Sequence, residues 1–426
     1  LALALTRLGK KEPALICYQK AIACRPDDYT LYNQYATVLE KCNRLAEARD
    51  AIANSFAFRP NNYGAVVNLA TIEYREGNYS EAYRLLKRLD LNGKTFEAAA
   101  TIKQQEGLAL DKLRRYSEAF ECFEKSNCFA VQTPAYRYLL SDYEDDLKKL
   151  ERSAAKLARN KIMPWKQPRF DEVRNAPIFL VGFPRSGTTL MEQVLNAHPK
   201  IVTLDERSPL QQIVEFIGTD SLSLGYLSNV STKKIENFRG EYFDLLQKRS
   251  GACDKEVLIV DKLPLNILYL PLIYRLFSNA RIIVALRHPL DCILSNFIQR
   301  FRLNKKMMNF LTLEDAAHFY ALTMGLYLKY RELIPLTVHE IKYERLTEDL
   351  VNETKSLAAF LNVEWSPEMM TYHRKASKRF INTPSYTEVI KPIHRKAVYR
   401  WENYRKHLSP ILPTVKSYID RFGYRV

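Results

Sequence analysis

The stretch PIFLVGFPRSGTTLMEQVLNAHP, residues 177–199, determines the fold expected for the second half of the chain. Its apolar run PIFLVG (177–182) is typical of a buried β-strand, and the run TTLMEQVLNA (188–197) is compatible with a helix. Between them, Gly182 and Gly187 bound a tight turn that brings several backbone N–H groups to a helix N-terminus. Because such turns bind phosphate or sulfate, the stretch predicts an anion-binding strand, loop and helix.

This loop departs at one position from the phosphate loop of nucleoside triphosphatases. Gly182, Gly187 and Thr189 fit the pattern G-x-x-x-x-G-K-[ST], but Thr188 stands where the phosphate-binding lysine belongs. A kinase with an atypical loop is therefore a distant alternative, because phosphoryl transfer would need that lysine.

Arginine and hydroxyl side chains stand in the loop instead. Arg185 supplies a planar, permanently charged guanidinium, and Ser186, Thr188 and Thr189 supply hydroxyl donors suited to a phosphosulfate without a magnesium ion. Taken alone, the loop leaves a second interpretation open, namely a generic Ser/Thr-capped helix after a buried strand.

A second strand end carries another potential anion site. The run RIIVALRHPLDCILSNF (281–297) places Arg287 at the end of a buried strand and Ser295 eight residues later. If Pro289 begins a helix, these two side chains can together bind an isolated phosphate. The alternative is an arginine that caps strand carbonyls and a serine that faces solvent.

Further apolar runs predict an α/β domain with a doubly wound parallel sheet flanked by helices. VLIV (257–260), RIIVAL (281–286) and LTVHEIKY (336–343) are the other expected strands, with helix-compatible segments between them. The sequence TLED at 312–315 resembles a capping box that begins a long helix through Tyr330.

The first third of the chain repeats itself every 34 residues. Turn-forming residues, small residues and the dipeptide Arg-Pro all recur at this spacing: Gly9, Asn43 and Gly77; Ala14, Ala48 and Ala82; and residues 25–26 and 59–60. This is the period of the tetratricopeptide repeat (TPR), an α-helical solenoid in which small residues let paired helices approach closely. NYSEAYRLLKRL (78–89) returns as RYSEAFECFEKS (115–126), so we expect a fourth, irregular repeat.

These patterns divide the chain into three parts. We expect a TPR domain over residues 1–130, a linking or capping helical segment over 131–174, and the α/β domain over 175–426. The linking segment has leucines at helical spacing, Leu139, Leu140, Leu147 and Leu150.

Composition limits the class of protein and its partners. Lys and Arg total 64 against 48 Asp and Glu, and the net charge of +16 favours anionic partners. Nucleic acid is not expected, because no basic-aromatic RNA motif or helix-turn-helix pattern occurs.

The cysteines and the apolar stretches bear on where the protein works. The seven cysteines have no CxxC spacing, which suits reduced thiols and suggests no metal site. The stretch 263–277 is too short and too polar to span a bilayer, so we expect a soluble, cytoplasmic protein. The start LALALTRLGK lacks Met and a secretory signal, which suggests an internal start of a longer chain.

Three segments together resemble the sulfotransferases that use 3′-phosphoadenosine-5′-phosphosulfate (PAPS), and most closely their tyrosylprotein branch. They are GFPRSGTTL (182–190), RHPLDCILS (287–295) and PSYTEVIKP (384–392) followed by RW (400–401), and the likeness covers about residues 175–410. The resemblance implies that Arg185, Ser186, Gly187, Thr188 and Thr189 bind the 5′-phosphosulfate. It also implies that Arg287 and Ser295 bind the 3′-phosphate, with no metal.

The same resemblance implies three catalytic residues. TTLMEQVLNAHPKIVTLDER (188–207) puts Glu206 where the branch has its catalytic base, and VDKLPLN (260–266) puts Lys262 where it has its lysine. Lys262 and Arg185 would stabilise the leaving phosphate. Without the resemblance, Glu206 reads as a helix cap and Lys262 as a solvated charge. His198 and His288 are second choices for the base.

The resemblance also covers the C-terminal segment and includes one departure. In the family a similar stretch forms a lid, which implies nucleotide contacts from Ser385, Lys391 and Arg400, with Tyr343 also matching. The alternative is a solvated basic face. Where the tyrosylprotein enzymes have an arginine after the 3′-phosphate serine, this chain has Gln299, with Arg300 and Arg302 close by as compensating residues.

The sequence therefore predicts a sulfotransferase that transfers a sulfuryl group from PAPS to an acceptor hydroxyl by in-line attack. The acceptor would be a peptide or protein tyrosine, and the TPR array would bind a protein partner. The alternatives are sulfation of a carbohydrate or small molecule, and a TPR interaction scaffold whose nucleotide-binding domain is degenerate.

Overall fold

The computed structural model describes residues 1–7, 10–157, 176–204, 208–218, 222, 224–251, 257–376, 383 and 386–426. The chain divides into two compact units. The repeat unit consists of Leu1–Tyr138 and Ile298–Arg302, and the sheet unit consists of Leu139–Phe297 and Leu303–Val426.

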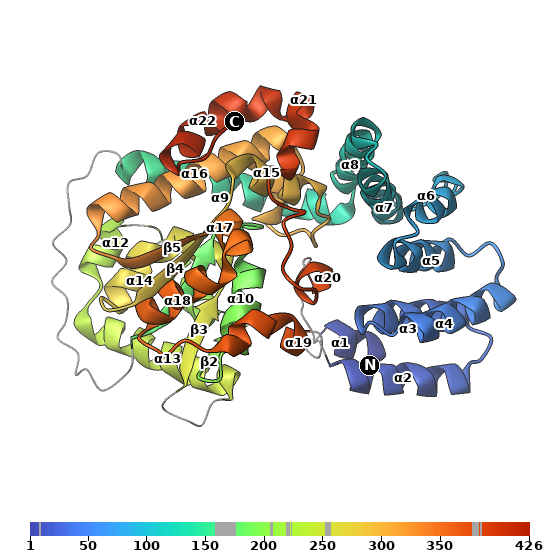
Figure 1. Ribbon diagram of the computed structural model, residues 1–426, viewed down its shortest axis with the longest axis horizontal. Coiled ribbons are helices and arrows are strands. Elements are labelled where there is room, and N and C mark those ends of the chain that lie inside the picture. Colours follow the sequence, from blue (N-terminus) through green and yellow to red (C-terminus); the bar gives the residue numbers. More distant parts are fainter. Residues whose placement is uncertain are drawn as a thin grey trace. The chain divides into compact units, whose positions relative to one another are not determined.

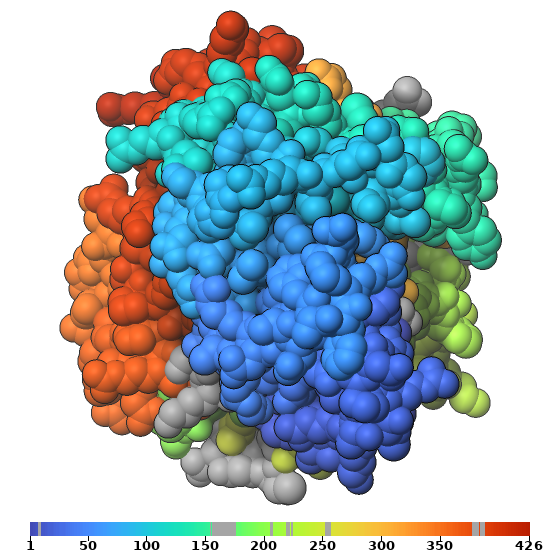
Figure 2. Space-filling view, turned by 90° about the vertical axis from the view of Figure 1, so that its right-hand side faces the viewer, coloured from blue at the N-terminus to red at the C-terminus, as the bar shows by residue number. Residues whose placement is uncertain are grey.

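Helices that contact one another in consecutive pairs build the repeat unit, and in the space-filling view its colours pass from blue to teal in chain order (Figure 2). Its helices are α1 (Ala2–Arg7), α2 (Lys11–Cys24), α3 (Tyr29–Lys41), α4 (Leu45–Phe58), α5 (Tyr63–Glu76), α6 (Tyr79–Lys87), α7 (Phe96–Lys112) and α8 (Tyr116–Ala130).

Residues in the left-handed conformation form the turn within each pair. Asn43 has φ 61° and Gly77 has φ 92°, as the repeated turn-formers predict, whereas Gly9 lies outside the described residues. Arg114 takes the same conformation with φ 61°. It lies 37 residues after Gly77 rather than 34, which confirms the slip of the fourth repeat.

Small residues lie between the paired helices. Ala14, Ala48 and Ala82 are 0% exposed, and Ala119 of the fourth pair is equally buried. Because a larger side chain at these positions would hold the helices apart, the 34-residue alanine pattern is explained by packing.

The sheet unit contains a parallel sheet in the order β2-β3-β1-β4-β5. Its strands are β1 (Ile178–Gly182), β2 (Ile201–Leu204), β3 (Leu258–Lys262), β4 (Arg281–Leu286) and β5 (Thr337–Lys342). The four predicted strands are confirmed. β2 was not predicted, because a four-residue edge strand is too short to give a periodic signal.

Helices cover both faces of the sheet (Figure 1). The α-helices that lie wholly or mostly in this unit are α9 (Pro134–Leu157), α10 (Thr188–Ala197), α11 (Pro209–Ile217), α12 (Leu224–Asn229), α13 (Thr232–Ser250), α14 (Leu270–Leu276), α15 (Pro289–Ile298), α16 (Leu313–Leu333), α17 (Tyr343–Glu348), α18 (Leu350–Leu361), α19 (Tyr372–Ala376), α20 (Tyr386–Val389), α21 (Arg405–Leu408) and α22 (Leu412–Arg421). Short 3-10 helices are η2 (Pro264–Tyr269), η3 (Met307–Phe310), η4 (Pro367–Thr371), η5 (Arg400–Tyr404) and η6 (Ser409–Ile411).

Alternate residues of the central strand β1 face opposite layers. Leu180 packs in a core with Val194 of α10 and Leu357 of α18. Phe179 points to the other face, where its ring lies 5.7 Å from Tyr242 of α13 and 6.3 Å from Phe277. Both faces are therefore buried, which explains why β1 reads as a continuous apolar run.

Two further helices agree with their sequence patterns. α9 carries the four spaced leucines, of which Leu150 is 1% exposed. α16 begins after Thr312, whose hydroxyl accepts a 3.0 Å hydrogen bond from the Asp315 N–H, as the capping pattern predicts. Among the described residues, none of the helices combines the length and the apolar content that crossing a bilayer requires.

Two helical glycines should respond oppositely to the same substitution. Gly240→Ala meets open space and should stabilise the protein by about 0.5–1 kcal/mol, because alanine has the higher helix propensity. Gly107→Ala puts a methyl group 2.5 Å from the buried ring of Phe123 and should destabilise it by about 1–3 kcal/mol. Chemical denaturation measures both, and stabilisation by Gly107→Ala would contradict the close α7–α8 contact.

Candidate functional site

The loop after β1 has a backbone shape that requires glycine at one position. Gly187, the residue before α10, has φ 100°, and a β-carbon there would lie 2.7 Å from Cδ2 of Tyr343. Arg185 also lies in the left-handed region, with φ 68°. The ring of Tyr343 therefore packs directly on the loop, at the carboxyl edge of the sheet where α/β proteins bind ligands.

Hydrogen bonds join this loop to α15. Arg185 Nε donates to Ser295 Oγ at 3.0 Å, and Arg287 Nη1 donates to the main-chain oxygen of Arg185 at 3.0 Å. Asn296 Nδ2 donates to the oxygen of Pro184 at 2.8 Å. The two predicted anion sites, 102 residues apart in sequence between Arg185 and Arg287, thus form one connected structure.

The connected loop and helix concentrate positive charge. Burial, together with the nearby charges of Arg287 and Arg400, lowers the pKa of Arg185 to about 10. Burial also acts to lower the pKa of Arg287, but Asp291 and other groups around it raise that pKa overall. The nearest Arg287–Asp291 approach is 3.7 Å. Arg287 additionally lies over the ring of Tyr343, 4.8 Å from its centroid.

Several polar atoms at this place suit an anionic ligand. Ser186 Oγ and Arg287 Nε are buried and have no hydrogen-bond partner among the described residues. Thr188 and Thr189 begin α10 and are 4% and 8% exposed. Unsatisfied donors at a helix N-terminus, with guanidinium groups beside them, fit a phosphate or phosphosulfate.

The C-terminal segment attaches to the start of α15 through its main chain. Arg287 Nη2 donates to the oxygen of Ala397, and the Asp291 carboxylate accepts hydrogen bonds from the N–H groups of Tyr399 (2.8 Å) and Trp401 (2.9 Å). This arrangement brings the segment with Arg400 to the cationic loop. Lys391 is exposed, and its main-chain oxygen accepts a hydrogen bond from Tyr372.

Lys262 is fully buried rather than solvated, so the interpretation as an exposed charge is wrong. Its ammonium lies 3.0 Å from the carboxylate of Glu192, a residue of α10 that is 2% exposed. Gln193 Nε2 also donates to Glu192 at 3.1 Å. Sequence reasoning missed Glu192, because a single acidic residue in an apolar helix gives no signal until its partner is known.

Asp261, the residue before Lys262, is the centre of a buried polar network. Its Oδ2 accepts hydrogen bonds from Ser208 Oγ (2.9 Å) and from the Tyr242 hydroxyl (3.4 Å), and Asn266 donates to Ser208 at 2.9 Å. Asp261 also pairs with Leu204 in the sheet. Leu204 and Ser208, the described residues on either side of the segment 205–207, are therefore both held by Asp261, one by strand pairing and the other by a hydrogen bond. Glu206 and Ser385 themselves lie outside the described residues.

The two histidines considered as bases have structural roles. His198 Nε2 bonds to the oxygen of Glu364 at 2.8 Å, and its Nδ1 accepts from the Lys200 N–H at 3.1 Å. His288 is 0% exposed and stacks on Trp401 with centroids 5.0 Å apart. Both rings thus take part in hydrogen bonds or ring packing within the described residues.

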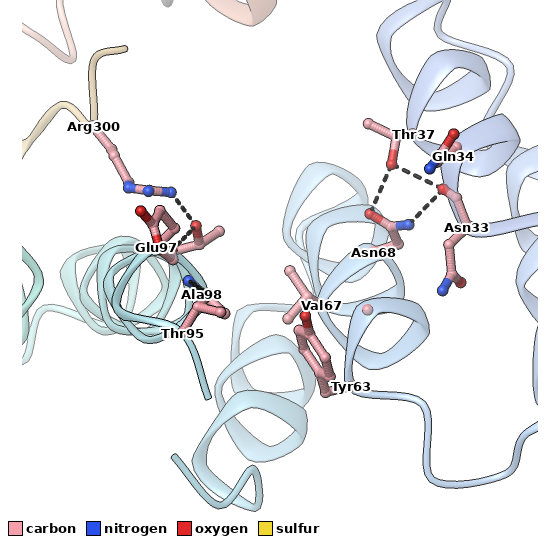
Figure 3. Close-up of a pocket in the computed structure, with 12 residues that line it drawn as sticks. Asn33, Gln34, Thr37, Tyr63, Val67, Asn68, Thr95, Glu97, Ala98 and Arg300 are labelled. Carbon is pink, nitrogen blue, oxygen red and sulfur yellow. Dashed lines mark hydrogen bonds between the residues drawn. The ribbon is translucent and has the colours of Figure 1, made fainter. Parts of the chain in front are cut away.

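Gln299 and Arg300 belong to the segment Ile298–Arg302, which forms part of the repeat unit. Arg300 donates a hydrogen bond to Thr101 Oγ1 of α7 in that unit (Figure 3).

Two parts of the chain have counterparts among known families. Residues 177–367 match the model of the Sulfotransferase family, and residues 17–50 match the tetratricopeptide repeat. The chain thus carries tetratricopeptide repeats, and the part that follows them is similar to the Sulfotransferase family over residues 177–367.

Two relatives are similar over long stretches. An uncharacterized protein of Aquifex aeolicus (strain VF5) is 26% identical over 384 residues, which are 88% of this chain and 48% of that protein. The chain thus spans about half the length of this relative. A putative protein-tyrosine sulfotransferase of Caenorhabditis briggsae is 22% identical over 241 residues, which are 53% of this chain and 80% of that protein.

Solved sulfotransferase structures are also similar. The sulfotransferase domain of the olefin synthase from Synechococcus PCC 7002 is 19% identical, with 56% of this chain and 91% of that chain covered and a TM-score of 0.39. Sulfotransferase STF9 from Mycobacterium avium is 14% identical, with 79% and 99% covered and a TM-score of 0.38.

The Asp261 network should give the stability of the protein a characteristic pH dependence. Burial raises the pKa of Asp261 to about 7, so between pH 4 and 7 the folded state binds a proton that the unfolded state has released. Stability therefore falls as the pH rises through this window, by up to about 4 kcal/mol from this group.

Asp261→Asn should remove this contribution and flatten the decrease in unfolding free energy between pH 4 and 7. Chemical denaturation at several pH values measures the slope, and Asp244→Asn, an exposed site on α13, is the control. Equal slopes for wild type and Asp261→Asn would show that Asp261 is ionised in the folded protein throughout.

Proposed function

We propose that this chain is a sulfotransferase that transfers a sulfuryl group from PAPS to the hydroxyl of an acceptor. The observation that carries the proposal is the connection of two arginine-bearing strand ends through the hydrogen bonds of Arg185 with Ser295 and of Arg287 with Arg185. One cationic loop could bind the phosphate of many nucleotides. A second cationic strand end, with Arg287 and Ser295, fixed beside that loop suits a nucleotide that is phosphorylated at two positions.

Each end of the donor has its own set of proposed contacts. Arg185, Ser186, Gly187, Thr188 and Thr189 would bind the 5′-phosphosulfate, because the loop offers backbone N–H groups, hydroxyls and a guanidinium. Supporting contacts for the nucleotide, including its 3′-phosphate, are proposed for Arg287, Ser295, Tyr343, Ser385, Lys391 and Arg400.

The transfer forms a bond between the acceptor oxygen and sulfur and breaks the bond between sulfur and the 5′-phosphate oxygen. Glu206 would take the proton of the acceptor hydroxyl. Lys262 and Arg185 would neutralise the charge that develops on the leaving phosphate. The ion pair with Glu192 supports this role for Lys262, because a carboxylate 3.0 Å away favours the charged ammonium in a buried place.

The acceptor would be a peptide or protein hydroxyl, with tyrosine as the first candidate. The similarity to a putative protein-tyrosine sulfotransferase supports this choice. The repeat array supports it as well, since stacked helical repeats form extended surfaces that bind other chains.

Isothermal titration with the bisphosphate product PAP, with AMP and with ATP tests the donor site. Wild-type protein should bind PAP at least tenfold more tightly than AMP without magnesium, and Arg287→Ala should abolish this preference by removing the 3′-phosphate contact. Lys248→Ala, an exposed cation on α13, is the control and should bind PAP as the wild type does. Equal binding of all three nucleotides would defeat the proposal and favour a repeat scaffold with a degenerate domain.

Glu206→Gln tests the proposed base independently of donor binding. The variant should bind PAP normally but lose about 100-fold or more in kcat with a labelled sulfuryl donor and a tyrosine peptide, because no base accepts the hydroxyl proton. Unchanged kcat in Glu206→Gln would remove Glu206 from the mechanism without affecting the donor site.

A further inference from the structure

Helix α10, which begins in the cationic loop, carries a row of polar residues along one side. Thr188, Glu192 and Asn196 are spaced four residues apart, which places them on the same face of the helix. Their exposed fractions are 4%, 2% and 5%, so the whole row is buried in the sheet unit. The proposed function gives a ligand contact to Thr188 only, and the other two residues need a separate explanation.

The two later residues of this row bind two neighbouring strands. Asn196 Oδ1 accepts a hydrogen bond from the Thr203 N–H of β2 at 3.3 Å, and Glu192 Oε2 lies 3.0 Å from the Lys262 ammonium at the end of β3. In the sequence, Glu206 follows the last residue of β2 by two positions. One helix therefore connects the cationic loop with the strand that precedes Glu206 and with the strand that carries Lys262.

Lys262 lies on the apolar side of its strand, where a charge needs a partner. Consecutive residues of a strand face opposite sides, so Lys262 faces the same side as Val260, and Asp261 faces the other side. Val260 is 0% exposed and belongs to the core that also contains Val194 of α10. An ammonium among such side chains is costly unless an opposite charge lies beside it, and α10 supplies that charge as the Glu192 carboxylate.

We infer that Glu192 is a positioning residue for the proposed transfer, which keeps the Lys262 ammonium charged and fixed relative to the cationic loop. The carboxylate stands one helical turn after Thr188, so the loop and the lysine are held by one element. Gln193 Nε2 donates to Glu192 Oε1 at 3.1 Å, which fixes the orientation of the carboxylate. Glu192 acts through Lys262 and makes no contact with the nucleotide itself.

This inference rests on the proposed function, because it takes Lys262 as the cation that neutralises the leaving 5′-phosphate. PAP retains that phosphate, so its binding reports on the charge of Lys262 without any acceptor. A merely structural ion pair would contribute to the stability of the protein, but its removal would not weaken PAP binding in a pH-dependent way.

Isothermal titration with PAP at pH 6 and pH 8.5 tests the inference, with wild type and variant compared at the same pH. In Glu192→Gln, Lys262 stays buried but loses the carboxylate, so it should release its proton at a lower pH than in the wild type. The variant should bind PAP within about threefold of the wild type at pH 6, and about tenfold more weakly or worse at pH 8.5, where the cation is lost.

A conservative variant and a double variant separate charge from packing. Glu192→Asp keeps the negative charge on a shorter side chain and should stay within about threefold of the wild type at both pH values. In the Lys262→Met background, adding Glu192→Gln should leave PAP affinity unchanged, because the two residues act through one another. This double variant pairs two neutral side chains, so it keeps the test decisive even if Glu192→Gln alone does not fold.

Thr354→Ala is the control for a loss of stability without a change at the site. It removes a buried hydroxyl of α18 that accepts a 3.0 Å hydrogen bond from Trp365, and it should bind PAP as the wild type does at both pH values.

Two results would overturn the inference while the proposed donor site stands. One is PAP affinity in Glu192→Gln that differs from the wild type by the same factor at both pH values, or not at all. The other is a further loss of affinity when Glu192→Gln is added to Lys262→Met, which would show that Glu192 acts independently of the lysine. Absence of PAP binding by the wild-type protein would instead defeat the proposed function, and the inference with it.

Discussion

The hydrogen bonds between the loop after β1 and helix α15 are the constraint on which the sheet unit depends. Several guanidinium groups gather there, and their mutual repulsion would separate the elements if nothing offset it. Three acceptors offset this repulsion. Arg287 donates to the main-chain oxygen of Arg185, Arg185 donates to the hydroxyl of Ser295, and the carboxylate of Asp291 lies 3.7 Å from Arg287. The cationic cluster is thus held by fixed acceptors, and an anion would relieve its remaining charge.

The order of the strands explains why these residues meet. β1 lies between β3 and β4, and parallel strands have their carboxyl ends at one edge, so the loop after β1 lies next to Lys262 and to the turn that carries Arg287. Tyr343 follows β5 and covers Gly187 from the same edge. The sheet therefore brings four separate strand ends to one edge.

Local patterns predicted most of this architecture, and contacts distant in sequence account for what was missed. The loop at Gly182–Thr189, the Arg287 and Ser295 pair and the 34-residue repeat each have a signal within one short segment. The partner of Lys262 did not, because Glu192 lies on another element and only packing brings the two together. For the same reason sequence alone left the two histidines open as bases, and gave no indication that Arg300 belongs to the repeat unit.

The hydrogen bonds that attach the C-terminal segment to the start of α15 use main-chain groups of that segment: the oxygen of Ala397 and the N–H groups of Tyr399 and Trp401. Every residue type except proline offers both groups, so these hydrogen bonds do not depend on the side chains of Ala397 and Tyr399. Trp401 is different, because its side chain is 1% exposed and stacks on His288. The segment next to the site can therefore change its chemistry at Ala397 and Tyr399 and keep its course over the protein, as long as the packing of Trp401 is retained.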